Sequence, residues 1–338
     1  MIFFCISVES LRKKNLQVEL MIKEFGAESS KSMEIEQKII VVAGSTGSGK
    51  SEVAINLAKE FNGELICSDS MQVYRQMNVG TATPSMQEQD LIPHHQIDLI
   101  NPDETYSAGQ YARDTSIIIK KIRERGRLPI LVGGTGLYYR ALMYGISKIP
   151  PVPKKLRKEI TDWQQLYGTP YCHKLLQKYD PAGADLIHPN DTSRVLRSLE
   201  VILSTGKSID SFRQEQPFGD AIYPFHAVAL NWDRNDLYQR INKRTLSMLG
   251  SGWLAEVEML LESYSPELKP MQSIGYREVV KYLQNKLKWD DMVEEIQKRT
   301  RQFAKRQLTW FRREAKIEWY QHFEQDRILA DIKVYLEN

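Results

Sequence analysis

The 338-residue sequence predicts an α/β fold, in which a parallel sheet is flanked by helices, a small all-helical domain is inserted and the C-terminal region is helical. Three observations indicate this class. Apolar runs alternate with segments of helical periodicity over residues 38–132, an order typical of a parallel, doubly wound sheet. A proline-rich stretch at 150–153 interrupts the alternation, and the charged residues 154–212 then have helical spacing. A strand expected at 227–231 returns the chain to the sheet.

The sheet is expected to begin with the β-branched run at 39–42, which stops at a glycine-rich turn. Apolar residues at helical spacing over 53–61 predict a helix after the turn, with Gly63 as its C-terminal cap. A second buried strand at 65–67 delivers Asp69 at its end. Folds of this class bind ligands at the carboxyl ends of their strands, so we expect the site there.

The later elements follow from the same patterns. A helix with one apolar face over 111–122 ends near Gly126, and a strand at 128–132 leads into the glycine turn 133–136. Helices are expected in the C-terminal region at 235–249, 252–263, 273–284 and 290–313. The expected domains are a flexible N-terminal extension (1–32), a catalytic core with basic C-terminal helices (33–145 and 226–338), and a helical insertion (146–225).

Composition excludes several classes of protein. With 42% hydrophobic and 26% charged residues, the chain matches an ordinary globular protein of about two domains. No apolar run approaches the roughly 20 residues that span a bilayer. The three cysteines, Cys5, Cys67 and Cys172, have no paired spacing, which excludes a disulfide scaffold and a cysteine zinc site. The first eight residues are apolar but follow no basic segment, so we expect a cytoplasmic location.

Residues 44–51, GSTGSGKS, match the pattern G-x-x-x-x-G-K-[ST] between a strand and a helix. Glycines let consecutive backbone N–H groups face an anion, Lys50 adds a positive charge, and Ser51 can bind Mg²⁺. A chance glycine-rich turn is the alternative, which the flanking elements disfavour. The sequence therefore predicts a P-loop-type sheet whose phosphate-binding residues are Gly44, Ser45, Thr46, Gly47, Ser48, Gly49, Lys50 and Ser51.

The strand at 128–132 has no acidic residue at its end. P-loop enzymes that hydrolyse nucleotides normally hold Mg²⁺ with a carboxylate at such a position, so its lack weakens the prediction of an NTPase. Asp69 is then the nearest expected acidic side chain. From the residues alone, Asp69 can be a Mg²⁺ ligand, a general base or the cap of a turn.

A cluster of cations is expected on the helix at 235–249. Arg240, Lys243 and Arg244 are neighbours at spacings of three and four, so their charges repel one another. A diphosphate held between them and the P-loop would offset that repulsion. A solvated basic face explains the cluster equally well.

A second cluster lies at 297–313, which holds seven basic residues and no acidic one. Aromatic residues are interleaved with the charges, as is typical of surfaces that bind a polyanion such as RNA, although a solvated stripe is the alternative. Arg194 and Arg197 of the helical insertion can extend this track. They can equally pair with Asp191 and Glu200.

Together the motifs resemble one family, the bacterial tRNA dimethylallyltransferases, also called isopentenyltransferases. The resemblance covers about residues 38–320. It depends on GSTGSGKS at 44–51, ICSDSMQVYRQMNVGTATP at 66–84, HHQIDLINPDETYSAGQYARD at 94–114, LPILVGGTGLYYRAL at 128–142, DPAGADLIHPNDTSRVLRSLEV at 180–201, QSIGYREV at 272–279 and RTRQFAKRQLTWFRR at 299–313. The zinc finger of eukaryotic relatives is missing, and Gly47 replaces a more usual alanine.

The resemblance implies transfer of a dimethylallyl group from dimethylallyl diphosphate to the exocyclic N6 amine of the adenosine 3′-adjacent to the tRNA anticodon, with release of diphosphate. It implies Mg²⁺ as cofactor, Asp69 as the base that accepts the amine proton, and Thr46 as donor to the bridging oxygen. Lys50 and Arg244 match the diphosphate clamps, and Ser51 the Mg²⁺ contact. The target base is expected to be flipped into a channel.

The resemblance also identifies positions that meet tRNA. They are Asp69, Ser70, Met71, Gln72, Thr135, Arg157, Ser193, Arg194, Val195, Leu196, Arg197, Gln272, Ser273, Ile274, Gly275, Tyr276, Arg277, Lys305, Arg306, Gln307, Leu308, Thr309, Trp310, Phe311 and Arg312. The expected partners are the tRNA anticodon stem-loop and dimethylallyl diphosphate. We expect neither a membrane nor an obligate protein partner, and a monomer.

Three other functions compete with this interpretation. An adenylate isopentenyltransferase uses the same donor with a free nucleotide acceptor, and has no need for the cationic helix at 297–313. A P-loop kinase or NTPase would need the missing carboxylate. A non-enzymatic RNA-binding protein leaves the P-loop and Asp69 without a role.

Overall fold

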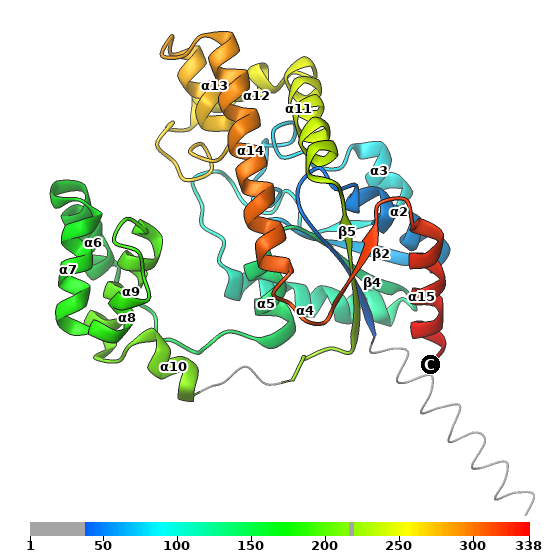
Figure 1. Ribbon diagram of the computed structural model, residues 1–338, viewed down its shortest axis with the longest axis horizontal. Coiled ribbons are helices and arrows are strands. Elements are labelled where there is room, and N and C mark those ends of the chain that lie inside the picture. Colours follow the sequence, from blue (N-terminus) through cyan, green and yellow to red (C-terminus); the bar gives the residue numbers. More distant parts are fainter. Residues whose placement is uncertain (1–37, 216–219) are drawn as a thin grey trace, which may run out of the picture. The chain divides into compact units, whose positions relative to one another are not determined.

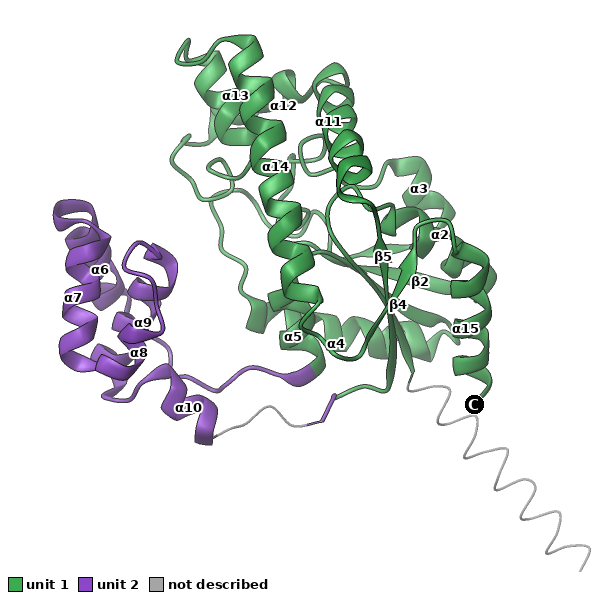
Figure 2. Cartoon of the chain, viewed as in Figure 1, with its two compact units in different colours: residues 1–143, 222–338 green, residues 144–221 purple. Residues whose placement is uncertain are grey.

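The structure is a computed structural model that describes residues 38–215 and 220–338. The expected N-terminal extension, residues 1–32, lies outside the described residues. The chain divides into two compact units, one formed by residues 1–143 with 222–338 and the other by residues 144–221 (Figure 2). No helix in the described part of the chain has the length and apolar content needed to cross a membrane.

The first unit is built on one parallel sheet of order β3-β2-β4-β1-β5-β6 (Figure 1). The predicted fold class and the four predicted strands are confirmed. The strands are β1 (Ile39–Ala43), β2 (Gly63–Ser68), β3 (His94–His95), β4 (Leu128–Gly133), β5 (Phe225–Asn231) and β6 (Ile317–Gln321). Because β4, β1 and β5 are central and buried on both faces, their sequences are continuous apolar runs.

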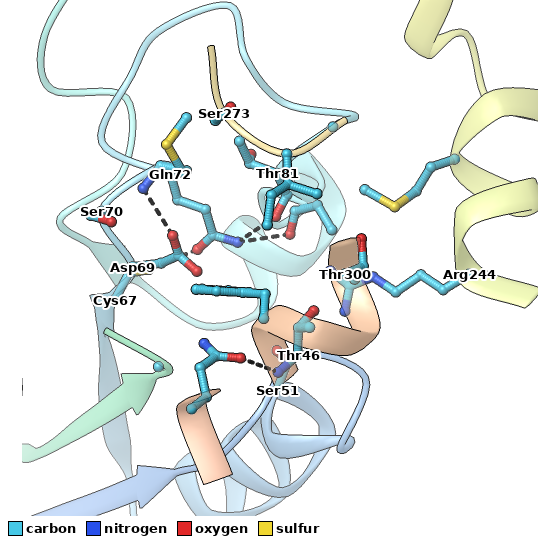
Figure 3. A pocket seen from close by; sticks show the side chains of 18 of the residues that line it. Thr46, Ser51, Cys67, Asp69, Ser70, Gln72, Thr81, Arg244, Ser273 and Thr300 are labelled. Carbon is cyan, nitrogen blue, oxygen red and sulfur yellow. Dashed lines mark hydrogen bonds between the residues drawn. The ribbon is translucent and has the colours of Figure 1, made fainter. Parts of the chain in front are cut away.

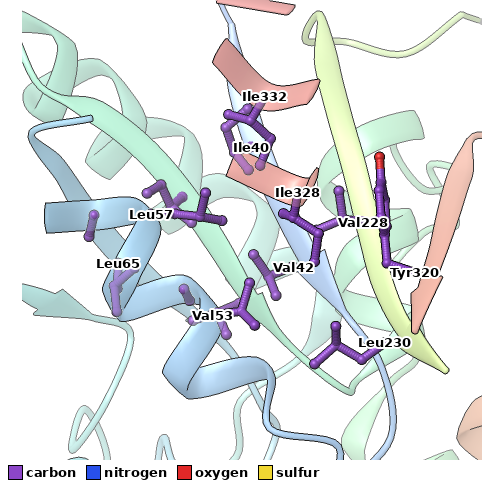
Figure 4. Packing of buried hydrophobic residues seen from close by; sticks show 14 of the residues in the cluster. Ile40, Val42, Val53, Leu57, Leu65, Val228, Leu230, Tyr320, Ile328 and Ile332 are labelled. Carbon is purple, nitrogen blue, oxygen red and sulfur yellow. The ribbon is translucent and has the colours of Figure 1, made fainter. Parts of the chain in front are cut away.

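The helices of this unit pack against the sheet and one another. They are α2 (Lys50–Glu60), α3 (Met86–Leu91), α4 (Ala108–Glu124), α5 (Gly136–Tyr144), α11 (Arg234–Gly250), α12 (Trp253–Ser263), α13 (Tyr276–Leu283), α14 (Trp289–Phe311) and α15 (Gln325–Glu337), of which α5 extends one residue beyond the unit. A core between the sheet, α2 and α15 joins Ile40 and Val42 to Leu57, Ile328 and Ile332 (Figure 4). This core fixes the start of α2 at the end of β1.

Two local predictions were wrong. Gly63 does not cap α2, because it is the first residue of β2, and the left-handed residue after the helix is Asn62 (φ 50°). A Cβ on Gly63 would lie 2.6 Å from Ile130 Cδ1, so close strand packing explains the glycine. The C-terminal region is not wholly helical, since β6 adds an edge strand. The short mixed segment IEWYQ has only Ile317 and Tyr320 buried, so its apolar signal is weak.

The second unit is all-helical in its described residues. Its helices are α6 (Lys154–Tyr167), α7 (Thr169–Tyr179), α8 (Pro181–Asp185), α9 (Thr192–Thr205) and α10 (Ile209–Glu215). Ile160, Cys172, Leu176, Val195 and Leu199 form its own apolar core. Because this unit has an apolar core of its own, it can hold its charged surface residues in place without contacts to the sheet.

Candidate active site

A cavity of about 600 Å³ opens at the carboxyl ends of β1, β2 and β4 (Figure 3). The P-loop forms its floor, where Gly44, Gly47 and Gly49 have φ angles of 145°, 79° and 90°, which only glycine adopts readily. These three glycines set the course of the loop backbone, and the other loop residues are placed along it. Thr46, Lys50 and Ser51 line the cavity, whereas Ser45 and Ser48 are buried behind it.

Two side chains hold the loop from outside the cavity. Arg240 Nε donates to Gly47 O at 3.0 Å, and Trp232 Nε1 donates to Ser48 O at 2.8 Å. The Arg240 guanidinium also lies over the Trp232 ring, 4.3 Å from its centroid. With their carbonyls bound on this side, the loop residues keep their curled conformation.

These contacts assign different places to the three cations of the cluster at 240–244. Arg240 is bound to the loop backbone, and Lys243 is exposed and does not line the cavity. Of the three cations only Arg244 lines it, and it points inward from α11 opposite Asp69 (Figure 3). The spacing of three and four places the three residues on one face of α11, but the cavity wall reaches only one of them.

Two cations that line the cavity, Lys50 and Arg244, share a single nearby carboxylate, that of Asp69. Burial lowers the pKa of Lys50 to about 8, with repulsion from Arg244 adding to the shift and attraction to Asp69 opposing it. Burial also lowers the pKa of Arg244, again against the attraction of Asp69. Two desolvated cations facing one carboxylate favour an anionic ligand.

Asp69 has one of its three predicted roles in the structure, that of a turn cap. One carboxylate oxygen, Oδ1, accepts a hydrogen bond from Met71 N at 2.8 Å, so Asp69 does cap a turn. The other oxygen makes no hydrogen bond to the described residues, and the side chain lies in the cavity wall (Figure 3). The turn therefore orients the carboxylate and leaves Oδ2 available to a ligand.

The residues after Asp69 are held by a network of hydrogen bonds. Ser70 N donates to Thr135 Oγ1 at 3.0 Å, which explains the position of Thr135 beside the site. Gln72 Nε2 donates to Thr81 O and Ala82 O at 3.1 and 2.9 Å, and Cys67 Sγ donates to Gln72 Oε1 at 2.7 Å. Ser70, Met71 and Gln72 all line the cavity.

The glycine turn after β4 has no room for a metal-binding side chain. A Cβ on Gly133 would lie 2.2 Å from Ser68 O, so this position excludes a carboxylate. The turn instead contacts α14, because Gln307 Nε2 donates to Gly134 O at 2.9 Å. Gln307 Oε1 accepts from Thr46 N, also at 2.9 Å.

The predicted RNA-contacting segments of the first unit meet at the cavity. Gln272, Ser273, Ile274, Tyr276 and Arg277 line it together with Arg306 and Gln307 of α14. Lys305, Thr309 and Arg312 are exposed, and their spacing of four and three places them on one face of α14. Phe311 is only 1% exposed and packs in the interior, whereas the partly buried Trp310 packs on Gly136. Gly275 packs on Trp253, and Leu308 is half-buried.

The remaining predicted RNA contacts lie in the second unit. Arg194 pairs with Asp191 at 3.4 Å, and Arg197 with Glu200 at 3.1 Å, as the alternative interpretation predicted. Arg157 also pairs with Glu200, at 3.2 Å.

Ser193 is exposed, and the half-buried Leu196 packs on the apolar core of this unit. Val195 is 0% exposed within that core. Burial rules out a side-chain contact of Val195 with RNA and corrects that prediction.

Sequence reasoning missed several residues of the site. Glu256, buried in α12, accepts hydrogen bonds from the backbone N–H groups of Asn78, Val79 and Gly80 at 2.7, 2.6 and 3.1 Å. Trp253, Met248, Ile296 and Thr300 supply much of the cavity wall that does not touch the P-loop, beside Phe303, which is one of the aromatic residues expected among the charges of 297–313. Helical periodicity marks these positions only as buried, because the partner that buries them is distant in sequence.

Comparison with known proteins identifies the family of this chain. A family model described as "IPP transferase" matches residues 72–314, and one described as "Isopentenyl transferase" matches residues 37–99. A protein of Geotalea uraniireducens named tRNA dimethylallyltransferase 2 is 42% identical over 288 residues, which is 85% of this chain and 93% of the relative. The resemblance inferred from the motifs is confirmed.

Solved structures share the fold. The full-length tRNA isopentenylpyrophosphate transferase of Bacillus halodurans is 35% identical with a TM-score of 0.67, over 89% of this chain and 97% of that one. A eukaryotic dimethylallyltransferase described as acting on tRNA is 32% identical with a TM-score of 0.74, over 88% of this chain and 77% of that one.

Proposed function

The chain belongs to the IPP transferase family, and from that premise we propose that it is a tRNA dimethylallyltransferase. It transfers a dimethylallyl group from dimethylallyl diphosphate to the N6 amine of the adenosine 3′-adjacent to the anticodon, and releases diphosphate. One observation of the structure supports this activity in addition to the family membership. Lys50 of the P-loop, Arg244 and Asp69 line one cavity. At the end of β4, where an NTPase would have a metal-binding carboxylate, the chain has glycines that are packed too closely for a side chain.

The donor diphosphate is held by Lys50, Arg244 and P-loop N–H groups other than that of Thr46, which donates to Gln307. Cleavage of the allylic C–O bond leaves the electron pair on the diphosphate, so negative charge grows there in the transition state. Fixed cations in a desolvated cavity stabilise that charge most strongly. The Thr46 hydroxyl donates to the bridging oxygen, which becomes the leaving oxygen. The loop backbone stays in place because Arg240 and Trp232 hold its carbonyls.

Asp69 acts on the acceptor. The adenine amine is a poor nucleophile until its proton is being removed, and a carboxylate within reach can accept that proton. As the N–C bond forms at the allylic carbon, the proton passes from the amine to Asp69 Oδ2. The hydrogen bond from Met71 N keeps Oδ1 fixed and thereby orients the carboxylate.

The donor set fits Mg²⁺ as a cofactor held largely by substrate. In the described part of the chain, no three His, Cys, Asp or Glu side chains are grouped as a metal site. Mg²⁺ often keeps several waters and binds substrate phosphates with one or two protein ligands. Ser51, which lines the cavity, would be such a ligand, and the ion when bound would neutralise charge on the diphosphate.

The acceptor is tRNA. Arg306 lines the cavity and its neighbour Lys305 is exposed, so a phosphate backbone would meet these two charges. Arg277 and Arg299 also line the cavity, but they pair with Glu278 and Glu295. Chemistry on a stacked base requires that base to leave the stack, and the cavity supplies the space for it. We propose that the protein acts as a monomer in the cytoplasm, where its substrate is found.

Mass spectrometry of tRNA nucleosides tests the function. Purified protein is incubated with dimethylallyl diphosphate, Mg²⁺ and either unmodified tRNA or AMP. We expect a prenylated adenosine from tRNA and none from AMP. Preferential prenylation of AMP would make the chain an adenylate isopentenyltransferase, and steady ATP hydrolysis without the donor would make it an NTPase.

A further inference from the structure

Gln307 ties the basic helix α14 to the donor site. It is 7% exposed and lies on the inner side of α14. Its Oε1 accepts from Thr46 N and its Nε2 donates to Gly134 O, both at 2.9 Å. One largely buried amide therefore joins the P-loop, the turn after β4 and α14.

α14 and the turn after β4 are packed so closely that no free space remains between them. A Cβ on Gly134 would lie 2.2 Å from Gln307 Nε2, and one on Gly136 would lie 2.4 Å from the Trp310 ring. Close-packed elements respond to displacement together, because no void can take up the movement. A shift of α14 must therefore move the turn, and with it the Thr46 end of the P-loop.

The outer side of the same helical turn faces the proposed RNA. Lys305 and Arg306, two residues and one residue before Gln307, are exposed, and Arg306 also lines the cavity. Lys305 has no ion-pair partner among the described residues, so its charge is available to a phosphate. Three consecutive residues thus join an RNA-facing surface to the donor loop.

We propose that Gln307 is a positioning residue that couples tRNA binding on α14 to donor binding in the P-loop. The coupling rests on the proposed function. RNA phosphates on Lys305 and Arg306 restrain α14, which keeps Gln307 against Thr46 N and holds the loop in its binding conformation. Linkage makes the effect reciprocal, so bound donor must increase the affinity for RNA by the same factor.

The experiment measures both affinities with and without the other ligand. The RNA is an anticodon stem-loop in which purine riboside replaces the target adenosine, so that no amine can react. The donor is dimethylallyl diphosphate with Mg²⁺. For the unchanged protein we expect the dissociation constant of each ligand to fall at least fivefold when the other is bound.

Gln307→Met removes both hydrogen bonds at similar volume, and we expect it to reduce this factor to about one. Gln302→Met, an exposed residue of the same helix, should retain the full factor. If Gln307→Met does not fold, Gln307→Glu keeps an acceptor for Thr46 N but loses the donor to Gly134, and should also lose the coupling. Thermal unfolding of each variant shows whether it is folded.

The outcomes separate the two proposals. Binding of both ligands to the unchanged protein without coupling would overturn the role of Gln307 and leave the proposed function standing. A Gln307→Met protein that unfolds at lower temperature but keeps the full factor would likewise overturn it, since the residue would then be only structural. Failure of the unchanged protein to bind either ligand would overturn both proposals.

Discussion

The Tyr276 hydroxyl donates a hydrogen bond to Glu256 Oε1 at 2.7 Å, deep between α12 and α13. Glu256 also accepts three backbone N–H groups from residues 78–80, and it forms no ion pair within the described part of the chain. These four donors stabilise a buried carboxylate without a cation. The pair therefore fixes the segment that follows Asp69 and Gln72 in the cavity wall.

Removal of this hydroxyl should weaken the wall. We expect Tyr276→Phe to lower the free energy of unfolding by about 1–2 kcal/mol, because buried Glu256 loses one of its four hydrogen-bond donors. Tyr282→Phe on the same helix is the matched control, since the Tyr282 hydroxyl makes no hydrogen bond to the described residues. Urea unfolding measures both. Equal losses in the two variants would show that the hydrogen bond does not stabilise the fold.

Donor affinity should depend on pH through Lys50. Its pKa is lowered to about 8, so the ammonium form declines in the free protein above that pH, whereas bound diphosphate favours the charged form. Binding must then take up a proton, and the affinity for dimethylallyl diphosphate should fall as pH rises from 8 to 10. Calorimetry in buffers of different ionisation enthalpy measures the uptake. Lys50→Met should bind weakly and lose this dependence, and Lys243→Met should keep it.

Asp69→Asn should separate catalysis from binding. The amide retains an oxygen for Met71 N but cannot accept the amine proton, so we expect kcat to fall by roughly 10²–10⁴. The affinity for tRNA should change little. Asp90→Asn, an exposed residue of α3, is the control. Single-turnover prenylation and filter binding supply the two measurements, and an unchanged rate would exclude Asp69 as the base.

Lys305→Ala should weaken tRNA binding in a salt-dependent manner. Loss of one phosphate contact reduces the slope of log affinity against log salt by about one. Lys333→Ala is the matched control, because Lys333 is also exposed and lies on α15. Binding titrations at several salt concentrations measure the slope. An unchanged slope in Lys305→Ala would show that this lysine does not contact phosphate.

Arg240→Ala should weaken donor binding, although Arg240 does not line the cavity. Without the hydrogen bond to Gly47 O, the loop loses one of its two external supports. We expect the affinity for dimethylallyl diphosphate to fall about tenfold, equivalent to about 1.4 kcal/mol. Lys243→Ala, on the same helix, should have no such effect. Wild-type affinity in Arg240→Ala would show that the hydrogen bond from Arg240 is not needed to hold the loop.

The P-loop shows which features could be predicted from a short stretch of sequence. The strand, the glycine turn and the helix over 39–60 could all be predicted, because their signals lie within one stretch of about 20 residues. Asp69 could be placed at the same edge, since parallel strands end together. The short strand β6 could not, as its pairing with β5 depends on a neighbour some 90 residues away in the chain.

By itself, the sequence of this protein determined the fold class, the anion-binding loop, the missing carboxylate after β4 and the family. Each depends on residue types at short, fixed spacing. The tertiary structure alone decided that Arg240 holds the P-loop while Arg244 enters the cavity, that Glu256 fixes residues 78–80, and that Gln307 reaches Thr46. These contacts join segments that are distant along the chain, and burial and distance between such segments are set only when the helices pack on the sheet.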